Sequence, residues 1–390
     1  MRGLVLKACA FRFLDTFLLI VPFYTVMFAE RGLNPAQIGV ALAAWSVTGL
    51  VLEIPSGVLA DRVSRRWLLF AAQLVRAVGF VLWIAFPSFW GFLLGLVLWG
   101  VKSAAVSGTF EALVYDELAA AGREDDYARM IGRTQAARFS GVVAASLAAA
   151  AVSAWVGYPA LVAASLAAGI AAAGMALTLP SAPKAAVTRR SSYLAHLRRG
   201  AADAVRLPGV LPLMVFISGI QAITLACADY WQLFAREVGL PLPAVALFIA
   251  ALAAAGAVAA MLAHRMHAAA APVLYGLIAV AGLSLAVAAA TFTLWSIVLP
   301  VIFVGLYWVV DVNADARFQH ALVGETRATV ASVKGFVTQC ATTVLILGFG
   351  LVAQAGSYRV AFLVYGIAMM ALGAAYGIGA WVRRVKAPAA

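Results

Sequence analysis

Long apolar runs alternate with short polar segments along nearly the whole chain. A helix needs about 20 mostly apolar residues to cross a bilayer. Charged residues, glycines and prolines divide this chain into twelve runs of roughly that length. The predicted spans are 8–29, 37–60, 67–87, 89–116, 139–157, 159–179, 210–235, 242–263, 270–290, 294–316, 335–355 and 358–381. The pattern therefore predicts an all-α membrane protein with twelve transmembrane helices.

One loop is much longer than the others and separates six spans from the next six. We expect an N-terminal six-helix bundle over 1–179, a cytoplasmic linker over 180–208 and a C-terminal six-helix bundle over 209–390. Apolar residues from Tyr193 to Val205 recur at helical spacing, with Arg198 and Arg199 on other faces. This predicts an amphipathic helix lying on the membrane surface, and a solvated linker is the alternative.

The composition excludes an ordinary soluble domain. Hydrophobic residues make up 65% of the chain and charged residues only 11%, whereas soluble domains carry about 25% charged residues. A soluble fold of this size could not hide so much apolar surface from water.

The basic residues predict the orientation of the chain in the membrane. With both termini cytoplasmic, inside segments hold 22 Lys and Arg residues, outside loops hold 3 and spans hold 3, together the 28 present. Cytoplasmic loops carry such an excess in membrane proteins. The net charge of +12 is thereby explained by topology and anionic headgroups, so no nucleic-acid partner is expected. We predict a multi-pass protein of a bacterial cytoplasmic (inner) membrane.

No residue pattern indicates a cofactor, a metal site or an enzyme. Cys9, Cys227 and Cys340 are scattered through apolar stretches, without metal-ligand spacing. The chain contains no phosphate-binding Gly-x-x-x-x-Gly-Lys motif, so an ion gradient is the expected energy source. Tyr115-Asp116 is similar to the first motif of intramembrane aspartyl proteases, but the second motif is absent. A membrane sensor that does not transport is the remaining alternative.

The two halves show a weak internal repeat. Leu59-Ala60-Asp61-Arg62 ends the second span, and Leu262-Ala263-His264-Arg265 ends the eighth. The segment from Gly57 to Arg66 also resembles the signature loop of the major facilitator superfamily, with Ser64 in place of its second glycine. The resemblance implies two pseudo-symmetric bundles around a central site and alternating access. We expect a monomeric transporter of a small organic molecule.

The signature loop is predicted to act as a gate. Gly57 would let two helices approach closely, and Asp61 would face a helix N-terminus, where the dipole favours an acid. The basic residues of the loop would pair with acids at the end of the fourth span and hold the cytoplasmic side shut. The predicted gating residues are Gly57, Asp61, Arg62, Arg65, Arg66, Glu111 and Asp116. A simple topology anchor is the alternative.

The fifth span bears on the direction of transport. It keeps Gly132 and Gly141 of the family's antiporter motif, but alanines and a serine replace the remaining glycines and the proline is lost. Proton-coupled efflux is our leading hypothesis, and this departure favours the alternative, a proton-coupled importer of a nutrient or siderophore-like compound.

Charged residues inside spans are costly and are candidates for function. In the fold implied by the resemblance, the first, fourth, seventh and tenth spans line the cavity. Aromatic residues on the same spans favour an amphipathic organic substrate over a sugar. The predicted cavity residues are Arg12, Asp15, Lys102, Asp229, Asp311, Tyr24, Trp99, Trp231 and Tyr307.

Three of these residues have predicted roles. Lys102 lies near mid-membrane with no obvious acidic partner, so we expect it to meet an anionic group of the substrate. Asp229 has no cation nearby on its segment, which favours it as the proton carrier, with Asp15 as the substitute. Arg12 and Asp15 are three residues apart and could instead neutralise each other.

A structural ion pair is predicted between the second and third spans. Glu53 and Arg76 lie at similar depths, about 12 to 14 Å from the cytoplasmic end at 1.5 Å per residue. Since an unpaired buried charge is costly, we expect these two side chains to pair.

Overall fold

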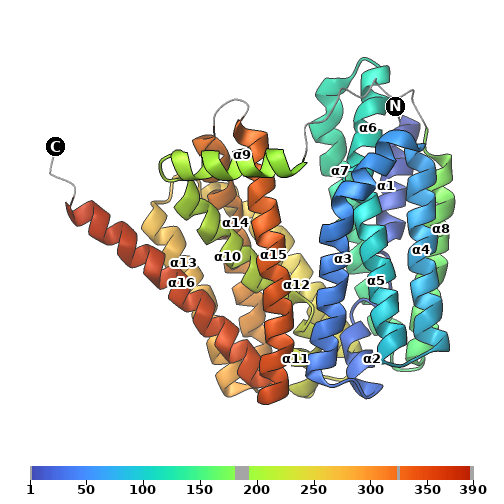
Figure 1. Cartoon of the computed structure of the whole chain (residues 1–390). Helices are drawn as coiled ribbons and strands as arrows, with labels where there is room; N and C mark the ends of the chain where they lie inside the picture. The colour runs from blue at the N-terminus through green and yellow to red at the C-terminus, as the bar shows by residue number, and fades with distance from the viewer. Residues whose placement is uncertain (1, 181–192, 323–325, 387–390) are drawn as a thin grey trace. The chain divides into compact units, whose positions relative to one another are not determined.

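The computed structural model describes residues 2–180, 193–322 and 326–386, which are almost entirely helical and contain no strand (Figure 1). The helices of the N-terminal half are α1 (Arg2–Thr16), α2 (Tyr24–Glu30), α3 (Pro35–Arg62), α4 (Arg65–Ala85), α5 (Phe89–Val106), α6 (Thr109–Ala120), η1 (Glu124–Asp126), α7 (Tyr127–Val152) and α8 (Tyr158–Thr178). Those that follow are α9 (Tyr193–Arg206), α10 (Val210–Ala228), α11 (Trp231–Glu237), α12 (Leu242–Leu262), η2 (Ala263–Met266), α13 (Ala271–Thr291), η3 (Leu294–Ile297), α14 (Val298–Ala321), α15 (Thr326–Ala355) and α16 (Tyr358–Lys386). The all-α prediction is confirmed.

Eleven helical segments of the described residues are long and apolar enough to cross a membrane. The one predicted span outside these eleven is the first, 8–29. It is present as α1 and α2, with an interruption between Thr16 and Tyr24. Irregular backbone is tolerated at membrane depth where protein covers it. Ile20 is fully buried in this interruption, and its amide donates to Ser165 Oγ of α8 at 3.0 Å. The broken first span thus completes a twelve-helix arrangement.

The chain forms two compact units. The first comprises Met1–Arg190 with Pro241–Ala250, and the second comprises Ser191–Leu240 with Ala251–Ala390. α9 occupies the stretch for which an amphipathic helix is predicted, and it packs on α15 in the second unit.

Close contacts between backbones hold the helices of the first unit together. A Cβ atom added at Gly79 of α4 would lie 2.9 Å from the carbonyl oxygen of Gly95 on α5. A Cβ atom at Gly100 would lie 2.8 Å from the carbonyl oxygen of Trp45 on α3. Small residues permit such approach between membrane helices, where dispersion contacts replace the hydrophobic effect as the driving force.

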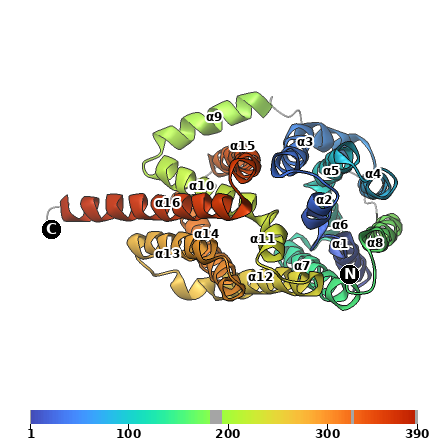
Figure 2. The same ribbon diagram turned by 90° about the horizontal axis from the view of Figure 1, so that it is seen from below.

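In the second unit, close backbone contacts of the same kind run along α13 and α16, which lie side by side (Figures 1 and 2). We call this line of contact the helix seam. A Cβ atom at Gly366 would lie 2.5 Å from the amide nitrogen of Ala286, and one at Gly373 would lie 2.5 Å from that of Ala279. At these two glycines, therefore, the seam has no room for a side chain.

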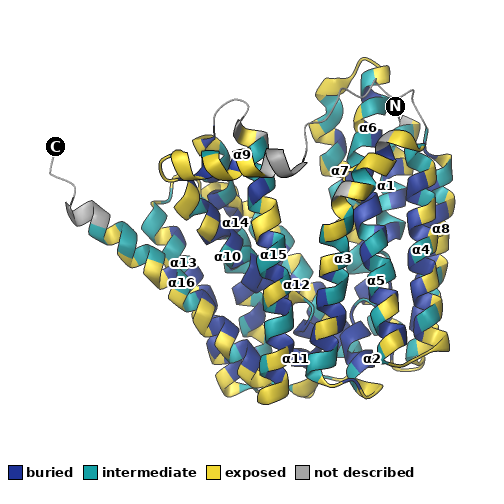
Figure 3. Cartoon of the chain, viewed as in Figure 1, coloured by how far each residue is buried: buried dark blue, intermediate teal, exposed yellow. Residues whose placement is uncertain are grey.

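Buried and exposed positions are distributed around nearly every long helix (Figure 3). Large apolar side chains are exposed on many of them, including Val51, Val78 and Leu283. Trp155 and Trp295 are exposed by 82% and 91% and lie at the ends of spans, as tryptophans do at membrane interfaces. The exposed apolar faces are suited to contact with lipid.

Candidate functional site

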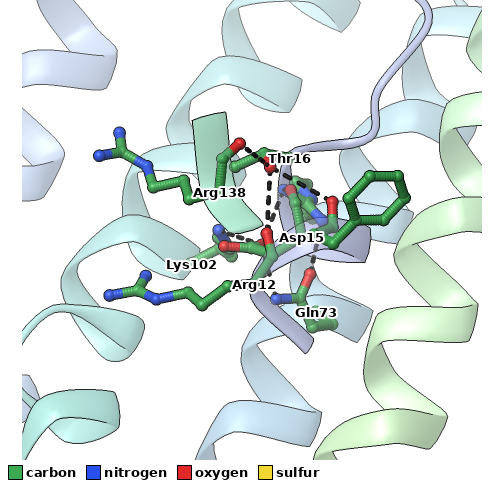
Figure 4. A network of polar contacts seen from close by, with 8 residues as sticks. Arg12, Asp15, Thr16, Gln73, Lys102 and Arg138 are labelled. Carbon is green, nitrogen blue, oxygen red and sulfur yellow. Dashed lines mark hydrogen bonds and ion pairs between the residues drawn. The ribbon is translucent and has the colours of Figure 1, made fainter. Parts of the chain in front are cut away.

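A buried polar network lies inside the first unit and is centred on Asp15 of α1 (Figure 4). Lys102 Nζ of α5 lies 2.5 Å from Asp15 Oδ1, and Arg76 Nη1 of α4 lies 3.2 Å from the same atom. Gln73 Nε2 donates to this carboxylate oxygen at 2.8 Å. All four side chains are buried, so the network joins three membrane helices away from solvent.

Arg76 is fixed by further hydrogen bonds. Its Nη1 donates to the backbone oxygen of Asp15 at 2.8 Å, and its Nη2 donates to Gln73 Oε1 at 2.6 Å. The network contains two cations, Arg76 and Lys102, but one carboxylate, that of Asp15. One positive charge in the buried cluster is therefore not neutralised within it.

A second ion pair lies one turn away on α1. Arg12 pairs with Glu111 of α6, and its guanidinium carbon lies 4.2 Å from the centroid of the Phe110 ring. Thr16 Oγ1 donates to the backbone oxygen of Arg138 at 2.8 Å, which ties α1 to α7. Figure 4 shows the side chains of Arg12 and Arg138 extending to the same side of the network.

The partners of these charges differ from those expected. Arg12 and Asp15 do not neutralise each other, because each is bound by residues of other helices. Lys102 does have an acidic partner, Asp15.

The predicted ion pair between Glu53 and Arg76 is wrong. Arg76 pairs with Asp15, whereas Glu53 is exposed and its side chain forms no ion pair with a described residue. The two residues do lie at comparable depth on their helices. Depth leaves the rotation of each helix undetermined, and Glu53 faces outward.

The signature loop places one of its arginines against the end of the fourth span. Arg65 pairs with Asp116 of α6, and its Nη1 donates to the backbone oxygen of Ala112 at 2.9 Å. This confirms the predicted pairing of a loop arginine with these acids. Glu111 pairs with Arg12 instead of the loop arginines. Gly57 lies in α3, Arg62 ends that helix and Arg66 is the second residue of α4, while the side chain of Asp61 lies outside the described residues.

A cluster of aromatic rings lies next to the network. Trp99 lies three residues before Lys102 on α5, and the two share a helix face. The Trp99 ring centroid lies 6.0 Å from the guanidinium carbon of Arg76, 6.2 Å from the Trp45 ring and 6.3 Å from the Tyr24 ring. Trp45 and Trp99 are half-buried. The predicted residues Asp15, Lys102, Trp99 and Tyr24 therefore belong to one cluster.

The second unit contains a different polar centre. Asp311 of α14 is buried, and Gln221 Nε2 of α10 donates to its Oδ1 at 2.8 Å. Thr338 Oγ1 of α15 donates to Ser218 Oγ at 3.0 Å and lies 3.5 Å from Gln221 Oε1. No described cation lies within ion-pair distance of Asp311. Among the described residues, its carboxyl group is thus held by the amide of Gln221.

Of the other predicted residues of the second unit, Tyr307 lies beside this centre, and Trp231 and Asp229 are not among its described partners. Tyr307 is buried one turn before Asp311 on α14. Trp231 is buried and stacks on Phe362, with the ring centroids 5.0 Å apart. Asp229 is half-buried at the end of α10.

Sequence reasoning missed Gln73 and Gln221. Both are uncharged, so a search for charges within spans does not find them. The available signal is an amide side chain in the middle of an apolar run, which needs a hydrogen-bonding partner in a membrane as a charge does.

The family of the chain follows from comparison with known proteins. A family model described as Major Facilitator Superfamily matches residues 8–337. The chain therefore belongs to the major facilitator superfamily and is a multi-pass membrane transporter, which confirms the resemblance read from the signature loop.

Two curated relatives match part of the chain. "Inner membrane transport protein YajR" of Escherichia coli (strain K12) is 33% identical over 131 residues, which cover 34% of this chain and 26% of that protein. An "Uncharacterized transporter" of Buchnera aphidicola subsp. Schizaphis graminum (strain Sg) is 30% identical over 86 residues, which cover 22% of each. The chain thus matches about a quarter of the length of these relatives.

Solved structures share the fold over the whole chain. A bacterial homolog of the human lysosomal transporter Spinster, in an inward-facing and occupied conformation, has a TM-score of 0.77 at 16% identity and covers 100% of this chain and 98% of its own. The nucleoside transporter NupG has a TM-score of 0.74 at 14% identity and covers 96% and 98%. The twelve-helix fold of two bundles is therefore confirmed, and fold alone is what these structures convey.

Proposed function

We propose that this transporter moves a small amphipathic organic anion across the bacterial inner membrane by alternating access, coupled to protons. The chain acts as a monomer with both termini cytoplasmic, needs no cofactor and exports its substrate. Transport as such follows from the family. The substrate class, the coupling ion and the direction are the parts proposed here.

The substrate class rests on the network of the first unit. Its surplus positive charge, from Arg76 and Lys102 against Asp15, lies beside the half-buried rings of Trp45 and Trp99. An anionic group would neutralise the surplus charge, and an apolar body would stack on the rings. This combination favours an amphipathic anion over a sugar.

The proposal of proton coupling rests on one observation: Asp311 is buried and has no ion pair with a described residue. A carrier must gain and lose a proton during the cycle. Protonating Asp15 would break its ion pairs with Lys102 and Arg76, whereas protonating Asp311 breaks no ion pair with a described residue and leaves its bond to Gln221 available. We therefore favour Asp311 over Asp15 as the proton carrier, and Asp229 is the next candidate.

Import is the second candidate direction, and one observation favours it. The fifth span, α7, runs without interruption from Tyr127 to Val152 and contains no proline. The kinked motif of antiporters is thus absent from this helix.

The test uses purified protein in proteoliposomes, with a panel of aromatic carboxylates and an internal pH-sensitive dye. Asp311→Asn should abolish uptake driven by a pH gradient but retain exchange of labelled for unlabelled substrate, because binding needs no proton transfer. The matched control is Asp203→Asn, which removes a carboxylate from α9. If Asp311→Asn keeps full gradient-driven transport, Asp229→Asn is tested next. Reversing the gradient in oriented vesicles separates export from import.

A further inference from the structure

A groove opens at one end of the first unit, away from the Asp15 network. It lies between the first two turns of α1 and the first two turns of α7, where η1 leads into α7, and its volume is about 550 Å³. Its walls combine arginines with apolar side chains.

The groove carries an excess of positive charge. Its lining contains Arg123, Arg129, Arg133 and a single acid, Asp126. Arg123 pairs with Asp126, so that acid is already engaged. The side chains of Arg129 and Arg133 are exposed and make no salt bridge or hydrogen bond with any described residue.

The spacing of Arg129 and Arg133 places two of these positive charges side by side. They are four residues apart on α7 and therefore neighbours on one face, where like charges repel. An anion between the two guanidinium groups would turn this repulsion into attraction. Arginine suits a phosphate group, because its planar fork binds two oxygens at once.

Apolar side chains also line the groove. Val5 and Leu6 of α1 line it together with Met130 of α7, and Leu6 is exposed by 73%. These residues lie at the ends of membrane-spanning segments, the depth at which lipid headgroups meet acyl chains. A ligand that fits both kinds of side chain has a phosphate at one end and a hydrocarbon chain at the other.

We propose that this groove binds an anionic phospholipid of the surrounding bilayer. Arg129 and Arg133 hold the phosphodiester group, and an acyl chain lies along Val5 and Leu6. Basic pockets between the ends of membrane helices recognise anionic headgroups in this way. Free phosphate would leave the apolar side chains unused.

The test measures lipid binding to the full chain in mild detergent by native mass spectrometry, with phosphatidylglycerol, phosphatidylcholine and inorganic phosphate as separate probes. Wild type should bind phosphatidylglycerol best. The Arg129→Gln/Arg133→Gln variant should bind it on the order of tenfold more weakly, since each arginine contributes to headgroup attraction. Glutamine is a good helix former, so α7 should remain intact.

The control is Arg206→Gln/Arg265→Gln, which removes the same charge from two exposed sites of the second unit. It should bind phosphatidylglycerol as wild type does. Equal losses in the two variants would show general attraction to basic surfaces and would overturn the site. Binding of inorganic phosphate as strong as that of the lipid would do so too.

A second measurement needs no arginine variant. Cys9 lines the groove, and Cys227→Ala/Cys340→Ala leaves it as the single thiol. Alkylation of Cys9 should be several times slower in nanodiscs of phosphatidylglycerol than of phosphatidylcholine. Equal rates in the two lipids would contradict occupancy of the groove.

Discussion

The two units hold their polar centres in opposite ways. In the first, Asp15 is bound by Lys102, Arg76 and Gln73, so full charges compensate one another inside the protein. In the second, Asp311 is held by Gln221 alone among the described residues, with hydroxyl groups nearby. Protonating Asp15 would break ion pairs, whereas Asp311 has no ion pair with a described residue to lose, and the more distant charges of Lys334 and Asp315 act on its carboxyl group. This difference supports the proposal that the first unit binds the charged group of the substrate and the second exchanges the proton.

The largest expected effect is that of Asp15→Asn. The change leaves Arg76 and Lys102 buried without a counterion, which should destabilise the protein by about 3 to 5 kcal/mol. Thermal unfolding in detergent checks this. Glu53→Gln, at an exposed carboxylate, is the control and should unfold as wild type does. Adding Lys102→Met to Asp15→Asn should restore part of the loss, and no recovery would contradict the proposed cause.

A smaller effect is expected at the helix seam of the second unit. Gly366→Val places a side chain where a Cβ atom already lies 2.5 Å from the Ala286 amide nitrogen, so α13 and α16 must separate. Overpacking of this kind costs about 1 to 3 kcal/mol. Gly276→Val is the matched control on α13, because nothing lies within 4 Å of its Cβ position. Similar unfolding temperatures for both variants would show that the seam adapts.

The smallest effect on stability is expected for Asp311→Asn. The amide keeps a hydrogen-bonding partner in Gln221, and no described ion pair is lost. The free energy of unfolding should change by less than about 1 kcal/mol, close to the value of one hydrogen bond. Unfolding in the same detergent checks this. A loss as large as that of Asp15→Asn would mean that Asp311 has a structural role and would remove the contrast between the units.

Hydropathy was enough to predict the spans, because a span needs only length and apolar composition, and the resemblance of the signature loop to a known family supplied their arrangement in two bundles. The same logic identified Asp15, Lys102 and Asp311, since each is an ionisable residue within an apolar run. It did not identify their partners. Pairing depends on how each helix is rotated about its axis, and Glu53 and Arg76 show that equal depth is insufficient. The interruption between α1 and α2 was also missed, because residues 17–23 continue the apolar run, although Pro22 within them is a residue that breaks helices.

The broken first span has a consequence for biosynthesis. It carries Arg12 and Asp15, and a charged residue at the centre of a span opposes insertion by roughly 2.5 to 3.5 kcal/mol. The partner Lys102 is synthesised 87 residues after Asp15 (102 − 15). At about 5 to 20 residues per second, that is a delay of roughly 4 to 17 s. During this interval the first span lacks part of its set of counterions, because Arg76 comes with α4, Lys102 with α5 and Glu111, the partner of Arg12, with α6. Its stable entry into the bilayer therefore depends on the arrival of α4, α5 and α6.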